Sequence, residues 1–89
     1  MSKIDKLIEH FKQVPKDFTY DEIVTLLTHF GYVQIKLGKS SGSAVKFGIP
    51  NTNNIVRFHK PHPGNILKKY VLDQVMEKLN QEGLIWKTQ

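Results

Sequence analysis

The spacing of apolar residues along this 89-residue chain changes at Gly31, and that change limits the folds it can adopt. Before Gly31, apolar side chains recur every three or four residues, the period of an amphipathic helix; after it they alternate, the period of a strand. A helical pattern returns beyond Pro63-Gly64. These patterns predict an α+β fold in which helices cover one face of a sheet.

Two helices are expected before Gly31. Their apolar stripes are Ile4, Leu7, Ile8 and Phe11, and then Ile23, Leu26, Leu27 and Phe30. Val14-Pro15 should stop the first helix, because the residue before a proline disfavours helical backbone. Thr19 and Glu22 have the spacing of a capping box and should start the second helix. Gly31 lies where a left-handed residue would end that helix.

Three strands are expected in the middle of the chain. Their alternating apolar residues are Val33, Ile35 and Leu37; Val45, Phe47 and Ile49; and Val56 and Phe58. The turn-rich segments 38–43 and 50–54 separate them, and such short connections favour a three-stranded antiparallel meander. If these apolar residues face the helices, the outer face of the sheet carries Gln34, Lys36, Ala44, Lys46, Arg57 and His59. This polar and cationic face is the surface that we expect to contact phosphates.

A last helix is expected after Pro63-Gly64 and before Gly83. Its stripe is Leu72, Val75, Met76 and Leu79, with Leu67 and Val71 as an extension. The apolar tail at 84–86 should pack back on the core. The predicted order is α–α–β–β–β–α, and without its first helix it is the order of double-stranded-RNA-binding domains. We therefore expect a single domain over residues 1–89, with that fold and one extra helix.

No acidic residue lies between Glu22 and Asp73. The intervening 50 positions hold seven fixed cations, and the whole chain has a net charge of +5. These cations are Lys36, Lys39, Lys46, Arg57, Lys60, Lys68 and Lys69. A positive field of this kind attracts polyanions, so nucleic acid is the expected partner class. A DNA-binding winged helix is disfavoured, because residues 23–30 contain no Lys or Arg that could read a groove.

The composition of the chain indicates the cellular compartment in which it is expected. The chain has no cysteine, which favours a reducing cytoplasm over an oxidising compartment. Its apolar runs span only a few residues, so no membrane span is expected. The early charges at Lys3 and Asp5 argue against a signal peptide.

Several segments resemble the HicA toxins of bacterial toxin–antitoxin systems. They are Tyr32, the Gly-Ser turn and strand from Gly38 to Phe47, and the run His59-Lys60-Pro61-His62-Pro63-Gly64. The resemblance covers about residues 19–85 and leaves residues 1–15 as an additional helix. It implies a fold like that of double-stranded-RNA-binding domains and cleavage of messenger RNA without a metal or cofactor. It also implies a HicB-type antitoxin as protein partner.

One position departs from the family pattern. In HicA toxins the Gly-Ser pair is typically followed by a His that is regarded as catalytic. Here Gly42 and Ser43 match, but Ala44 follows them, and a methyl group cannot exchange a proton. Three explanations are open: a substitution that silences a toxin, a branch that uses another base, or a module that binds RNA or an antitoxin without cleaving.

Cleavage of RNA without a metal needs a base for the 2′-hydroxyl, an acid for the leaving 5′-oxygen and cations beside the phosphate. His59 is the candidate for proton transfer, because imidazole titrates near neutral pH. The expected RNA contacts are Lys36, Lys39, Gly42, Ser43, Lys46, Arg57 and Lys60. Alternatively, His59 and His62 only hold the turn before the last helix. No metal site is expected, because two histidines without a carboxylate supply too few ligands.

Overall fold

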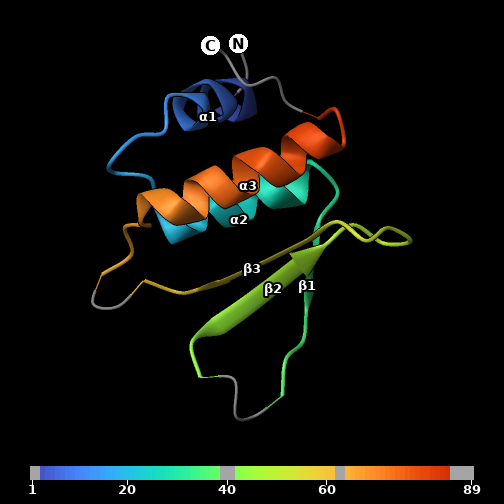
Figure 1. Ribbon diagram of the computed structural model, residues 1–89. Helices are drawn as coiled ribbons and strands as arrows, with labels where there is room; N and C mark the ends of the chain where they lie inside the picture. Colours follow the sequence, from blue (N-terminus) through green and yellow to red (C-terminus); the bar gives the residue numbers. More distant parts are fainter. Residues whose placement is uncertain (1–2, 39–41, 62–63, 85–89) are drawn as a thin grey trace.

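The computed structural model describes residues 3–38, 42–61 and 64–84. Within these ranges, helices pack on one side of a three-stranded antiparallel sheet (Figure 1). The elements are α1 (Lys3–Lys12), α2 (Tyr20–His29), β1 (Val33–Ile35), β2 (Ala44–Gly48), β3 (Ile55–His59) and α3 (Lys69–Gln81). This arrangement confirms the α+β fold and its order α–α–β–β–β–α.

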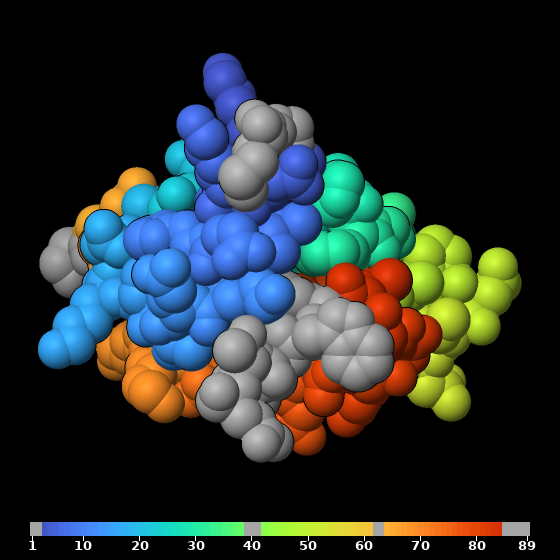
Figure 2. All heavy atoms as spheres, turned by 90° about the horizontal axis from the view of Figure 1, so that it is seen from above, coloured from blue at the N-terminus to red at the C-terminus, as the bar shows by residue number. Residues whose placement is uncertain are grey.

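The core lies between the helices and the inner face of the sheet. Its buried apolar residues are Phe11, Phe18, Ile23, Leu26, Leu27, Tyr32, Val45, Phe47, Val56, Phe58, Leu67, Val71, Leu72, Val75, Met76 and Leu79. Helix α1 joins this core through Phe11, which is fully buried with its ring 5.5 Å from that of Phe18. Seen from the helical side, α1 lies across the middle of the molecule (Figure 2).

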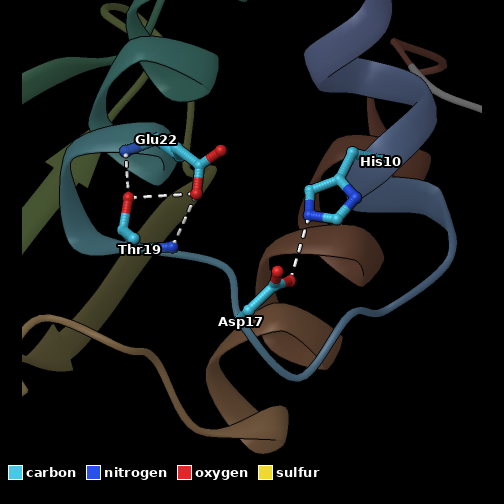
Figure 3. A network of polar contacts seen from close by, with 4 residues as sticks. All are labelled: His10, Asp17, Thr19 and Glu22. Carbon is cyan, nitrogen blue, oxygen red and sulfur yellow. Dashed lines mark hydrogen bonds and ion pairs between the residues drawn. The ribbon is translucent and has the colours of Figure 1, made fainter.

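Local signals set both ends of α2 where the sequence predicts them. The Thr19 hydroxyl accepts a hydrogen bond from the Glu22 amide at 3.2 Å, and the Glu22 carboxylate accepts one from the Thr19 amide at 2.9 Å (Figure 3). These two bonds satisfy backbone donors that the first helical turn leaves free. At the other end Gly31 has a φ of +94°, and the Tyr32 amide donates to the Leu27 carbonyl at 3.0 Å. This is a Schellman motif, which favours glycine at the left-handed position.

The link between α1 and α2 also carries a local contact. His10 Nε2 lies 3.2 Å from Asp17 Oδ1, and the two side chains face each other across the turn (Figure 3). The His10 ring also packs against Phe18, with ring centroids 5.7 Å apart. These contacts give His10 a structural role in the link between the two helices.

Strands β2 and β3 face as predicted, whereas the facing predicted for β1 is wrong. Opposite residues in an antiparallel pair lie on the same face. Gln34 pairs with Phe47, and Ile35 pairs with Lys46. Gln34 is therefore on the helical side and Ile35 on the outer face, a shift of one residue that reverses every side chain of the strand.

Tyr32 explains this reversal. It takes the core position expected of Val33: Tyr32 is 2% exposed and Val33 is 51% exposed. The Tyr32 hydroxyl donates a 2.6 Å hydrogen bond to Asn54 Oδ1, and Asn54 Nδ2 donates to the Lys78 carbonyl at 2.8 Å. This buried chain joins the start of β1, the β2–β3 turn and α3. It determines which residues of β1 face the helices and which face outward.

Helix α3 starts later than expected. Residues 64–68 are not helical; instead, Ile66 forms a β-bridge with Thr19. The Leu67 amide donates to the Phe18 carbonyl at 2.9 Å, so Leu67 enters the core from an extended segment and not from the helix. Gly83 ends α3 with a φ of +68°, as predicted.

The predicted apolar tail is only partly described. Leu84 is 37% exposed, and positions 85 and 86 lie outside the described residues. Among the described residues, no helix combines the length and hydropathy that a membrane span requires.

Candidate functional site

One end of the molecule brings together four chain segments. The start of β2, the end of β3 and the first turns of α2 and α3 lie near one another at the left of Figure 1. The Lys60 amide donates to the Ser43 carbonyl at 3.0 Å, which joins the two strands beyond their regular pairing. The Tyr20 amide donates to the Asn65 carbonyl at 2.8 Å, which joins the segments that lead into the two helices. Residues far apart in sequence therefore share this surface.

Ser43, Ala44 and His59 are neighbours in this structure. Ala44 pairs with His59 across β2 and β3, so the two side chains lie on the outer face of the sheet. Ser43 Oγ lies 3.2 Å from His59 Nδ1. When the hydroxyl donates this bond, Nδ1 is the acceptor and the ring proton of neutral His59 is on Nε2. Nε2 is then a proton donor; in the other tautomer it is an acceptor.

Lys46 and Arg57 are the next outward pair along the same two strands. They lie two residues from Ala44 and His59, respectively, on the same face. In the described part of the chain the ion pairs are His10–Asp17 and Lys69–Asp73, so neither Lys46 nor Arg57 is neutralised by a described carboxylate. These two cations can therefore attract a phosphate group.

Lys60 is held beside this end of the sheet by Tyr20. Its ammonium nitrogen lies 5.6 Å from the centroid of the Tyr20 ring, within the range of a cation–π contact. The Tyr20 ring in turn packs edge-on against Phe58, with centroids 6.3 Å apart. Burial, with a further contribution from the negative charge of Asp21, raises the pKa of Tyr20. Tyr20 therefore stays a neutral aromatic platform under Lys60.

A pocket of about 300 Å³ opens directly beside His59. It is lined by Ser43, His59, Lys60, Pro61, Ile66, Leu67, Lys68, Tyr70 and Val71. Sequence reasoning missed this pocket, whose lining includes Tyr70, a side chain that is 57% exposed and lies outside the core. The available signal was the helical period: Tyr70 lies off the stripe formed by Leu72, Val75, Met76 and Leu79.

The structure gathers most, not all, of the predicted site residues. Ser43, Ala44, Lys46, Arg57, His59 and Lys60 lie at this end of the sheet or on its outer face. Gly42 precedes them with a φ of +62°, a backbone conformation that suits glycine. Lys36 was predicted on the outer face. It follows Ile35, the last paired residue of β1, which is itself on the outer face, so continued alternation would turn Lys36 to the helical side.

The two remaining sequence candidates, Lys39 and His62, lie outside the described residues. Within the ranges that are described, no three His, Cys, Asp or Glu side chains gather as a metal site would require.

A family model described as the HicA toxin of bacterial toxin–antitoxin systems matches residues 20–81. This chain belongs to the HicA toxin family. The matched segment begins with the first residue of α2 and ends with the last residue of α3, so it contains the whole sheet and the described site. Helix α1 precedes the match, although its Phe11 is part of the core. Membership in this family implies an antitoxin partner.

Comparisons with curated proteins and with solved structures found no match.

Proposed function

We propose that this HicA-family protein binds RNA at the outer face and open end of its sheet, and that a His at position 44 would complete a ribonuclease site there. The pairing of Ala44 with His59, beside Ser43, carries this proposal. Opposite residues of an antiparallel pair have Cβ atoms only about 4.5–5.5 Å apart. An imidazole at position 44 would therefore lie beside that of His59.

Two adjacent imidazoles supply both proton transfers that metal-free RNA cleavage needs. One removes the proton from a 2′-hydroxyl, whose oxygen attacks the neighbouring phosphorus. The other gives a proton to the 5′-oxygen as its bond to phosphorus breaks. The products are a 2′,3′-cyclic phosphate and a free 5′-hydroxyl. With Ala44 one of the two proton-transfer groups is missing, so we expect this chain to bind RNA and to cleave it slowly or not at all.

The remaining groups suit the phosphate. Lys46 and Arg57 lie on the same face, unpaired with any described carboxylate, where they would stabilise the extra negative charge of the pentavalent phosphorus. Ser43 orients His59 through their 3.2 Å contact and thereby selects which ring nitrogen faces the substrate. This assignment gives His59 a chemical role in place of a purely structural one.

Restoration of the missing imidazole tests the proposal. We expect Ala44→His to cleave labelled single-stranded RNA in the presence of a chelator about 10²- to 10⁴-fold faster than the starting chain, the range of general acid–base catalysis. Ala44→Gln is the matched control, because it adds a polar side chain that cannot exchange a proton. The double variant Ala44→His/His59→Ala should lose most of the gain.

Three results separate the explanations for Ala44. Cleavage only by the His variant would identify a nuclease silenced at this position. Equal cleavage by the starting chain and by Ala44→His would place the base elsewhere and refute the proposed pair. RNA binding without cleavage by either protein would favour a binding module.

A second function is suggested by the apolar part of the outer face. Val33 and Ile55, 51% and 36% exposed, project on the same side as Ile35 around Gly48 and next to the Lys46–Arg57 pair. An acidic partner with apolar side chains would complement this surface. We propose that a HicB-type antitoxin docks here and competes with RNA. Val33→Asp should then weaken antitoxin capture in a pull-down, whereas RNA affinity should remain within about twofold if the apolar patch does not touch RNA.

A further inference from the structure

The pocket beside His59 has two chemically different parts. Its floor is apolar, formed by Leu67 and Val71, which are 4% and 2% exposed. One side is an open apolar wall formed by Ile66 and Tyr70, which are 47% and 57% exposed. Exposed apolar groups that line one concavity mark a binding site more strongly than the same groups scattered singly.

The rim of the pocket is polar and cationic. Lys60 and Lys68 line it together with Ser43 and His59. Neither lysine forms an ion pair with a described carboxylate: the ion pairs among the described residues are His10–Asp17 and Lys69–Asp73. A ligand that suits both parts has a flat apolar portion for the wall and a negative charge for the rim. A nucleotide has this composition.

We propose that the pocket holds one unstacked base of a single-stranded RNA, with the Tyr70 ring as its stacking platform. This inference rests on the proposed function, because it names the form of RNA that the same site takes. A volume of about 300 Å³ lies at the lower end of ligand pockets and suits one base, not several nucleotides. A paired base cannot enter, since the bases of an RNA duplex are stacked inside the helix.

The position of the pocket next to His59 gives the base a function. A base fixed against Tyr70 would anchor its own ribose and phosphate near Lys60, Lys68 and His59. Such anchoring sets which phosphodiester lies beside the Ala44–His59 pair. Tyr70 is therefore a positioning and specificity residue, while the cations supply affinity for the backbone of any sequence.

The test measures the contribution of the bases to RNA affinity separately from that of the sugar–phosphate backbone. Binding is measured by fluorescence anisotropy for a labelled single-stranded oligoribonucleotide and for a chain of equal length whose riboses lack bases. The proteins are the starting chain, Tyr70→Phe, which keeps the ring, and Tyr70→Ala, which removes it. Because Tyr70 is 57% exposed, both variants should keep the thermal stability of the starting chain.

We expect the starting chain and Tyr70→Phe to prefer the base-containing strand by about 5- to 150-fold, the range for one stacked base. Tyr70→Ala should lose most of this preference and bind the abasic chain as tightly as the starting chain does. Equal preference in Tyr70→Ala and Tyr70→Phe would overturn the stacking role while backbone binding, and with it the proposed function, still stands. A starting chain that binds neither strand would overturn both proposals.

Discussion

The salt dependence of RNA binding tests which lysines face the site. Among the described residues, four cations lie at the outer face and the pocket rim, namely Lys46, Arg57, Lys60 and Lys68. Each phosphate contact contributes about −0.7 to the slope of log affinity against log salt for a single strand, so four contacts predict a slope of about −2.8. With this slope, affinity for a single-stranded RNA falls about 50-fold between 50 and 200 mM salt.

Variants that neutralise single charges show which side chains contribute to the slope of log affinity against log salt. Lys46→Gln should make it shallower by about 0.7, because one contact is lost. Lys6→Gln in α1 is the matched control: it removes the same charge from an exposed position in the helical layer and should leave the slope unchanged. Fluorescence anisotropy titrations at five or so salt concentrations, with the same labelled oligonucleotide, give the slope for each protein.

Lys36→Gln is the variant that decides the register of β1. Regular alternation places Lys36 on the outer face and predicts the same loss of slope as for Lys46→Gln. The pairing of Gln34 with Phe47, continued one residue past the end of β1, puts Lys36 on the opposite side and predicts no loss. A loss for Lys36→Gln equal to that for Lys46→Gln would refute the facing described here. Equal losses for all three variants, Lys6→Gln included, would show that only net charge matters and that no defined face binds RNA.

Two further predictions concern the buried polar chain that fixes β1. Asn54→Ala should lower the free energy of unfolding by about 2–4 kcal/mol in urea denaturation, because it leaves the Tyr32 hydroxyl and the Lys78 carbonyl without their partner; a loss below about 0.5 kcal/mol would refute the role of this chain. Burial, assisted by the charge of Glu82, raises the pKa of Tyr32 to about 12, so the folded state holds this proton more tightly than the unfolded state does. The resulting stability is complete below pH 10 and is lost as the pH rises towards 12. Tyr32→Phe should therefore show a weaker loss of stability over that range than the starting chain, and identical pH profiles would contradict this reasoning.

The extra helix α1 has no counterpart in the matched family segment, yet the core includes it. Phe11 is fully buried against Phe18, which immediately precedes the capping box of α2. Helix α1 lies on the helical side of the sheet, whereas the Ala44–His59 pair lies on the outer face. We therefore expect its contribution to be to stability, and it leaves the proposed RNA-binding surface uncovered.

Interactions between near neighbours in the chain account for the features that were predicted correctly. Thr19 and Glu22 are three residues apart and cap each other directly, and Gly31 tolerates the left-handed backbone of the Schellman turn. Such signals act within a few residues, so they can be identified without knowledge of the fold. Alternation in β2 and β3 likewise predicted that Ala44 and His59 share the outer face, since one apolar face must be buried.

Contacts between distant segments decided the rest. The phase of β1 depends on Tyr32, which bonds to Asn54, 22 residues away. Alternation shows that β1 is a strand, but not which of its faces is buried, because an edge strand can carry apolar residues on the outer side. Ile66 pairs with Thr19, 47 residues away, in the non-helical segment 64–68 that precedes α3, and it lines the same pocket as Tyr70. These contacts form only when the core brings the distant segments together. A pattern within a few residues of the sequence therefore does not predict them.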